Sequence, residues 1–116
     1  MIQLTPHMRI FLAREAVDFR KGIDGLVAVV RDVFERDPFS GHVYVFHNKG
    51  RTSFKILVYD GTGFWLMIKR LSHGRYRRFE TSAAGSIIPL AVPELQVILV
   101  NGDTSRLQVP APWRPV

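Results

Sequence analysis

The sequence predicts an α+β fold, an antiparallel β-sheet meander with two helices in the order β-α-β-β-β-β-β-α. Three observations support this prediction. An apolar stripe with helical spacing runs from Ile23 to Phe34, three strand-like segments between residues 42 and 69 are joined by short turn-rich connections, and a second helical pattern follows Pro93. A sheet of this kind is expected to carry its helices on one face.

The first predicted element is a strand over residues 8–13, whose side chains favour β-structure. The first helix begins after Gly22 and repeats apolar residues at spacings of three and four. Asp24 lies in its first turn, where the helix dipole favours an anion. Pro38 ends this helix, because proline disfavours the α-conformation in the residue before it.

The central part of the chain is predicted to be a set of hairpins. Strands are expected over residues 42–47, 53–59 and 64–69, because each segment alternates its side chains between two faces and short turns separate them. A tight turn at residues 72–74 then leads into residues 75–79, which are predicted to be a fourth strand of the meander.

The C-terminal part is predicted to contain one more strand and one more helix. Residues 86–90 form the short strand, Pro93 suits the first turn of the helix, and Asn101-Gly102 ends it. The chain is therefore expected to form a single α+β domain over residues 1–102, followed by a proline-rich extended tail over residues 103–116.

The composition excludes several classes of protein. The chain of 116 residues is 47% hydrophobic and 22% charged, as in ordinary globular proteins rather than disordered ones. It has no cysteine, which excludes disulfide scaffolds, thiolate zinc sites and iron–sulfur clusters and is natural for a cytoplasmic protein. No apolar run approaches the roughly 18 residues of a membrane span, so no membrane association is expected.

Positive charge is concentrated in one window of the sequence. The net charge is +6, from 16 Lys and Arg against 10 Asp and Glu. Residues 49–78 hold eight of the basic residues and one acid, Asp60, whereas the rest of the chain is close to neutral. Such a window indicates a polyanionic partner, either nucleic acid or an acidic protein face. The alternative is that these are solvated charges that protect strand edges from aggregation.

The sequence shows no constellation of catalytic or metal-binding residues. The acidic residues are too scattered to hold divalent metal ions as nucleases do, and His42 and His47 point to opposite faces of a strand. The Gly61-Thr62-Gly63 motif leads into a strand, so it lacks the helix N-terminus that a nucleotide site requires. We therefore expect a protein without catalytic residues, bound metal or cofactor.

A resemblance to a known family begins at residues 18–26, which read Asp-Phe-Arg-Lys-Gly-Ile-Asp-Gly-Leu. This segment resembles a signature of the second-ORF accessory proteins, called TnpB, of insertion sequence 66 type transposons. Further motifs of that family follow in the same order up to about residue 79, including Asp37-Pro38-Phe39-Ser40-Gly41, Tyr59-Asp60-Gly61-Thr62-Gly63-Phe64-Trp65-Leu66 and Gly74-Arg75-Tyr76. The chain departs from the family pattern at residues 77–80, where many members have Trp-Pro.

The resemblance implies a small non-catalytic accessory protein of DNA transposition, encoded beside a large transposase that carries the strand-transfer site. Its expected partners are transposon-end DNA, the transposase, or both. The alternative is an adaptor that binds an acidic transposase surface without touching DNA, and an exposed strand edge is compatible with a homo-oligomer. The residues expected to contact DNA or partner are Arg20, Lys21, Lys49, Arg51, Lys69, Arg70, Arg75, Tyr76, Arg77 and Arg78.

Two interpretations of the signature segment are open at this point. In the first, Arg20 and Lys21 join the backbone amides at the helix N-terminus to form an anion site. In the second, Gly22 and Gly25 let the helix pack closely on the sheet, while Asp18 and Arg20 tie the junction together.

Overall fold

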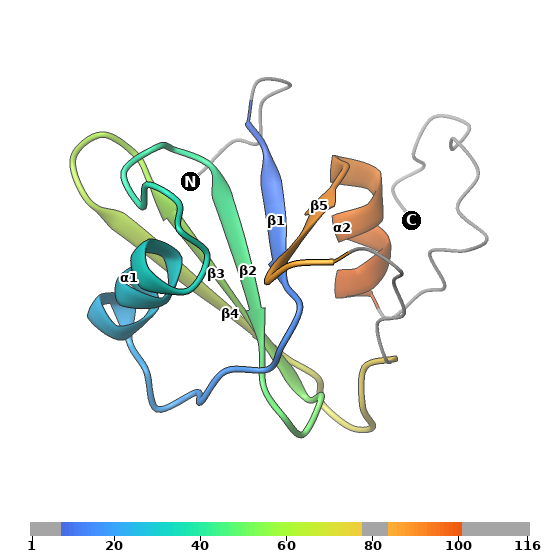
Figure 1. The fold of residues 1–116 in the computed structure, drawn as a ribbon. Coiled ribbons are helices and arrows are strands. Elements are labelled where there is room, and N and C mark those ends of the chain that lie inside the picture. The colour runs from blue at the N-terminus through green and yellow to red at the C-terminus, as the bar shows by residue number, and fades with distance from the viewer. Residues whose placement is uncertain (1–7, 78–83, 101–116) are drawn as a thin grey trace.

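The computed structural model describes residues 8–77 and 84–100, which Figure 1 draws as the coloured ribbon. Its elements are β1 (Ile10–Ala13), α1 (Ile23–Asp32), β2 (Val43–His47), β3 (Ser53–Tyr59), β4 (Phe64–Arg70), β5 (Ile87–Leu90) and α2 (Val92–Leu99). The predicted α+β class and the order of these elements are confirmed. Residues 75–77, which we expected to begin a further strand, are not part of the sheet. Residues 78–79 and the predicted tail at 103–116 lie outside the described residues.

The sheet has the strand order β4-β3-β2-β1-β5. The predicted meander is confirmed, because β2, β3 and β4 pair antiparallel with their neighbours in sequence. β5 also pairs antiparallel with β1. The pairing of β1 with β2 is parallel and not antiparallel as predicted. A parallel pair needs a long crossover connection, and α1 provides it between these two strands.

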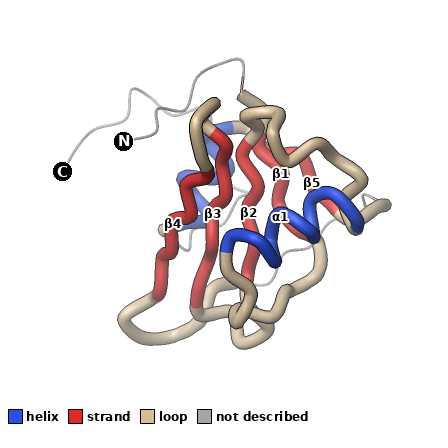
Figure 2. Tube along the Cα trace, turned by 90° about the vertical axis from the view of Figure 1, so that its left-hand side faces the viewer, coloured by secondary structure: helices blue, strands red, loops and turns tan. Residues whose placement is uncertain are grey.

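The two helices lie on opposite faces of the sheet, so the expectation that both lie on one face was wrong (Figures 1 and 2). Alternate residues of each inner strand point to the two faces. The core on the α2 face consists of Ile10, Leu12, Val43, Val45, Phe54, Val58, Tyr76, Leu95 and Ile98. The core on the α1 face consists of Phe11, Ala13, Leu26, Val29, Val30, Phe34, Tyr44, Phe46 and Leu57.

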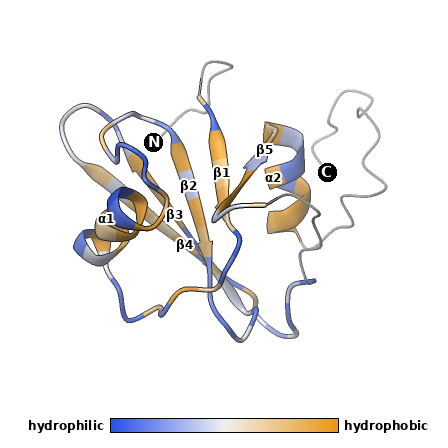
Figure 3. Cartoon of the chain, viewed as in Figure 1, coloured by the Kyte–Doolittle hydropathy of each residue, from blue (hydrophilic) through white to orange (hydrophobic). Residues whose placement is uncertain are grey.

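Because both faces are covered, every residue of β1 and of β2 is buried. The inner strands are accordingly among the most apolar parts of the chain in Figure 3. The two successive apolar layers hold the sheet between the helices and leave its loops at the two ends in solvent.

Both helices are short, with ten residues in α1 and eight in α2. α1 ends at Asp32, several residues before Pro38, because Glu35 adopts a left-handed conformation with φ of 55°. Phe34 still reaches the core, whereas Val33, which belonged to the predicted apolar stripe, is exposed. Within residues 8–77 and 84–100, no helix is long and apolar enough to cross a membrane.

His47, the last residue of β2, is a polar side chain buried in the sheet. Its Nε2 lies 2.9 Å from the carbonyl oxygen of Ala13 at the end of β1. Burial lowers the pKa of His47 below its usual value, because the charged imidazolium is disfavoured away from water. Burial, together with the nearby charges of Arg9 and Arg36, also lowers the pKa of His42.

We expect the free energy of unfolding to decrease as the pH is lowered below about 6.5, the ordinary histidine pKa. The unfolded chain binds protons at these histidines with the ordinary pKa near 6.5, whereas the folded chain resists protonation. The stabilisation is therefore complete above about pH 6.5 and is lost as the pH falls toward the folded-state pKa. Urea unfolding at a series of pH values measures this effect. The variant His47→Gln should show a weaker pH dependence than His73→Gln in an exposed turn, and equal dependences would contradict the assignment to His47.

Candidate functional site

Three loops meet at one end of the sheet. β1 and β2 run parallel, so the loop at 14–22 and the turn at 48–52 leave the sheet at the same end. Ser53 pairs with Arg70, which brings the end of β4 and the segment 71–77 to that end too. Backbone hydrogen bonds join the loops, from Val17 N to His47 O at 2.9 Å and from Leu71 N to Thr52 O at 2.9 Å.

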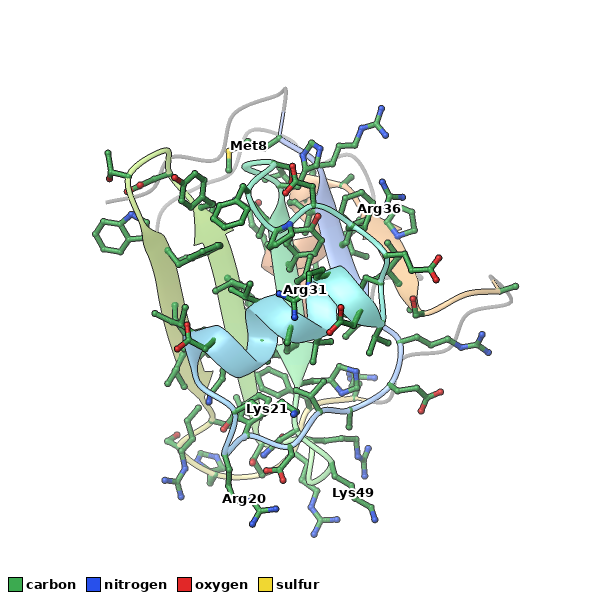
Figure 4. The ribbon with its side chains drawn as sticks, turned by 60° about the vertical axis from the view of Figure 1, so that its left-hand side comes forward. Met8, Arg20, Lys21, Arg31, Arg36 and Lys49 are labelled. Carbon is green, nitrogen blue, oxygen red and sulfur yellow. The ribbon has the colours of Figure 1, made fainter. Side chains whose placement is uncertain are left out.

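This end of the molecule is strongly basic. We define the basic end as residues 14–22, 48–52 and 69–77. It contains two acids, Glu15 and Asp18, and nine basic residues: Arg14, Arg20, Lys21, Lys49, Arg51, Lys69, Arg70, Arg75 and Arg77. Figure 4 shows Arg20, Lys21 and Lys49 together at this end, away from Met8 and Arg36. Residues that are distant in sequence therefore contribute to one positively charged surface.

Local hydrogen bonds fix the shape of the signature segment. The Asp18 carboxylate accepts from the Arg20 backbone N at 2.9 Å and from the Arg20 guanidinium at 2.6–3.1 Å. The Arg20 side chain is 91% exposed. Hydrogen bonds from its guanidinium and backbone are the main reason that the pKa of Asp18 is lowered to about 2. Asp18 therefore stays ionised and neutralises part of the Arg20 charge at physiological pH.

Lys55 of β3 holds the signature segment against the sheet. Its Nζ donates to the carbonyl oxygens of Phe19 and Lys21, both at 2.9 Å, and lies 4.9 Å from the centroid of the Phe19 ring. The side chain is buried in β3, with 7% of its surface exposed. One of the eight cations in the basic window is thus a structural group that holds the loop on the sheet. It is not available to an external partner.

The segment before α1 agrees with the second of the two interpretations in one respect. Asp18 and Arg20 tie the junction, as that interpretation expected. Neither glycine is required for close packing on the sheet, because no atom of the sheet is among the nearest that a Cβ at either position would meet. A Cβ built on Gly25 would lie 3.0 Å from the Cβ of Lys21, so Gly25 leaves room for the Lys21 side chain. A Cβ on Gly22 would meet no atom within 4 Å.

The turn between β2 and β3 is held rigid by Asn48. Its Oδ1 accepts from the backbone N of Thr52 at 2.9 Å and of Ser53 at 3.1 Å, and its Nδ2 donates to the Thr52 hydroxyl at 2.8 Å. These bonds fix the turn before any partner arrives and present the exposed Lys49 at its tip. A cation on a fixed turn loses less conformational entropy on binding than one on a mobile loop.

The segment 71–77 packs against that turn, and Tyr76 is the residue that attaches it. Tyr76 N donates to Arg51 O at 2.6 Å, and the Arg51 guanidinium donates to Tyr76 O at 3.3 Å. The Tyr76 ring is 2% exposed and lies 4.3 Å from the Phe54 ring. We had expected Tyr76 at the contact surface. Its ring belongs to the core of the α2 face, so it does not stack on a partner's bases.

The structure brings together most of the residues predicted for the site. Lys21, Lys49, Lys69, Arg70, Arg75 and Arg77 are exposed, as is Arg20, while Arg51 is half-buried. Arg78 lies outside the described residues. Sequence reasoning missed Arg14, an exposed residue at the end of β1. Recognising β1 as a parallel neighbour of β2 would have placed Arg14 beside the turn at 48–52.

No group of three or more His, Asp or Glu side chains suited to a metal ion occurs in the described part of the chain.

Comparison with known proteins gives a consistent match. The family described as IS66 Orf2 like protein matches residues 8–108. Two proteins of Sinorhizobium fredii (strain NBRC 101917 / NGR234) are similar to this chain. The uncharacterized protein y4hO is 30% identical over 115 residues, which cover 99% of this chain and 96% of the relative. The uncharacterized protein y4jC is 37% identical over 76 residues, which cover 66% of this chain and only 65% of the relative. No solved structure matches.

Proposed function

Because the chain belongs to the IS66 Orf2-like family, whose members are accessory proteins of transposition, we propose that it assists transposition by binding DNA through the basic end. The observation that carries the proposal is the gathering of nine basic side chains and two acids from three separate segments of the chain. Such a concentration of positive charge suits the phosphate backbone of DNA, which is the main source of sequence-independent affinity.

The chemistry of the basic end favours phosphate contacts over base reading. Arginine forks bind phosphate oxygens in pairs, and lysines act as point charges toward them. Tyr76, the aromatic residue among those expected to contact DNA or a partner, is buried and cannot stack on bases. The basic end consists mainly of loops and turns, together with the last two residues of β4 and the segment that leads into α1. We therefore propose that the protein positions DNA and does not select its sequence.

A matched pair of variants tests this proposal. Lys49→Gln/Arg70→Gln removes two exposed charges from the basic end, and Arg9→Gln/Arg31→Gln removes two exposed charges elsewhere. Both variants have the same net charge. If each lost contact removes about 0.9 from the slope of log affinity against log salt, the first variant should lose roughly 1.8 and the second should lose nothing. Fluorescence anisotropy with a labelled DNA duplex at several salt concentrations measures both slopes.

Three results would contradict the DNA proposal. They are the absence of DNA binding by the unchanged protein, equal slopes for all three proteins, or equal losses in the two variants, which would mean that only net charge matters.

An adaptor that binds an acidic transposase surface is the second candidate. Binding to the transposase that survives nuclease treatment, together with no affinity for free DNA, would support the adaptor instead.

A further inference from the structure

The strand β4 forms one edge of the sheet. It pairs with β3 alone among the described strands, and Figure 2 shows it at the left-hand edge of the sheet, opposite β5. Its seven residues pair with β3 without a bulge, from Phe64 opposite Tyr59 to Arg70 opposite Ser53. An edge strand of this length presents a regular row of backbone N–H and C=O groups to whatever lies beside it.

The two edges of the sheet are built differently. β5, at the other edge, is four residues long and contains Pro89, and both features discourage pairing with another chain. β4 has neither a proline nor a charge in its first five residues. Instead it exposes three large apolar side chains, with Trp65 at 43%, Met67 at 38% and Ile68 at 62%. Its two charges, Lys69 and Arg70, lie together at its last two positions.

We propose that two copies of this chain associate through antiparallel pairing of their β4 strands, which joins the two sheets into one. With Met67 placed opposite its own copy, all seven residues of the strand are paired. Leu66 then lies opposite Ile68 of the second copy, so the apolar side chains in the middle of the strand cover each other. This pairing places the same face of both sheets on the same side, and the two-fold axis passes between the Met67 residues.

The charges of β4 favour a second copy of the chain as the partner and favour antiparallel over parallel pairing. In the antiparallel pairing Lys69 lies opposite Trp65 of the second copy, and Arg70 lies opposite Phe64, so each cation meets an aromatic ring. The Asp60 carboxylate, which accepts from Trp65 Nε1 at 2.7 Å, is at the same end and complements the incoming lysine. A parallel pairing would instead place Lys69 and Arg70 beside their own copies, which like charges oppose.

Concentration-dependent sedimentation of the full chain tests the proposal. The unchanged protein should shift from a mass of 13.3 kDa toward twice that value as its concentration rises. Met67→Lys places two like charges on the two-fold axis and should weaken the association roughly tenfold or more. Val33→Lys makes the same change at another exposed apolar residue and should leave the association unaltered. Circular dichroism establishes that each variant is folded.

A charge-swap experiment locates the contact. Met67→Glu alone should also be monomeric, but an equimolar mixture of Met67→Lys and Met67→Glu should associate again, because opposite charges then meet on the axis. Since the chain has no cysteine, Met67→Cys should form a disulfide-linked dimer on mild oxidation, and Val33→Cys should not.

Several results would overturn the inference. One is a chain that stays monomeric at every concentration measured. Others are a dimer that Met67→Lys does not weaken, or a mixture of the two charged variants that does not associate. Protection of the β4 backbone from hydrogen exchange only when another protein is added would show that the edge receives a foreign strand, which also rejects a second copy as the partner.

Discussion

Replacing Lys55 with methionine is expected to lower the free energy of unfolding by about 3 kcal/mol or more, because two hydrogen bonds from a charged donor are lost and each is worth about 1.5–3 kcal/mol. The Lys55 ammonium donates to two backbone carbonyls of the signature segment and is shielded from solvent. Methionine keeps the apolar stem and removes the donor, so both carbonyls lose their partner. Urea unfolding monitored by tryptophan fluorescence measures the change.

The exposed Lys69 provides the matched control for Lys55. Lys69→Met removes the same charge from the neighbouring strand and should change stability by no more than about 0.5 kcal/mol. Hydrogen exchange supplies a local readout, since Lys55→Met should also speed exchange in the first turn of α1. Equal destabilisation by the two variants would mean that the loss of charge, and not the anchoring of residues 18–22, determines the effect.

The second large effect is expected at Tyr76. Tyr76→Ala should lower the free energy of unfolding by about 3–5 kcal/mol, as removal of buried aromatic side chains generally does. The ring fills the core beside Phe54. Tyr76→Phe keeps the ring and removes only the hydroxyl, which donates to Leu99 O at 3.4 Å, so it should cost no more than about 1 kcal/mol.

The same two variants distinguish a core residue from a DNA contact. Tyr76→Phe should bind DNA with unchanged affinity and salt dependence, and thermal unfolding with anisotropy titration measures both properties. If Tyr76→Ala were destabilised by less than about 1 kcal/mol and lost DNA affinity, the ring would have to contact DNA, contrary to its burial.

The strands could be predicted because each one is specified by a local pattern of its own residues. The segment at 53–59 alternates its side chains and is followed by a tight turn, and β3 has those bounds. The arrangement of strands depends on distant contacts and was less predictable. The sequence does contain a signal for helices on both faces: Ile10–Ala13 is a continuous apolar run, which is typical of a strand buried on both sides. We interpreted it only as β-forming.

The residues that form the basic end were predicted better than their arrangement in space. Charge counting found the cations of the basic window but could not separate Lys55, whose neighbours in space are the carbonyls of a loop more than thirty residues away. The alternation of residues 75–77 resembled a strand because a buried tyrosine stands between two exposed arginines. Here the alternation reflects one ring packing on Phe54, and backbone pairing to another strand is not involved.

The position of β1 between β2 and β5 has a consequence for the order in which the protein is made. Among the described strands β1 is the first to be synthesised, yet its two neighbours in the sheet are β2, about thirty residues later, and β5, near the end of the described chain. Its backbone can be paired on both sides only after Ile87–Leu90 has left the ribosome. The meander of β2, β3 and β4 has no such delay, because its contacts are local and close early. One side of Ile10–Ala13 must therefore stay unpaired until the last strand of the sheet has been translated.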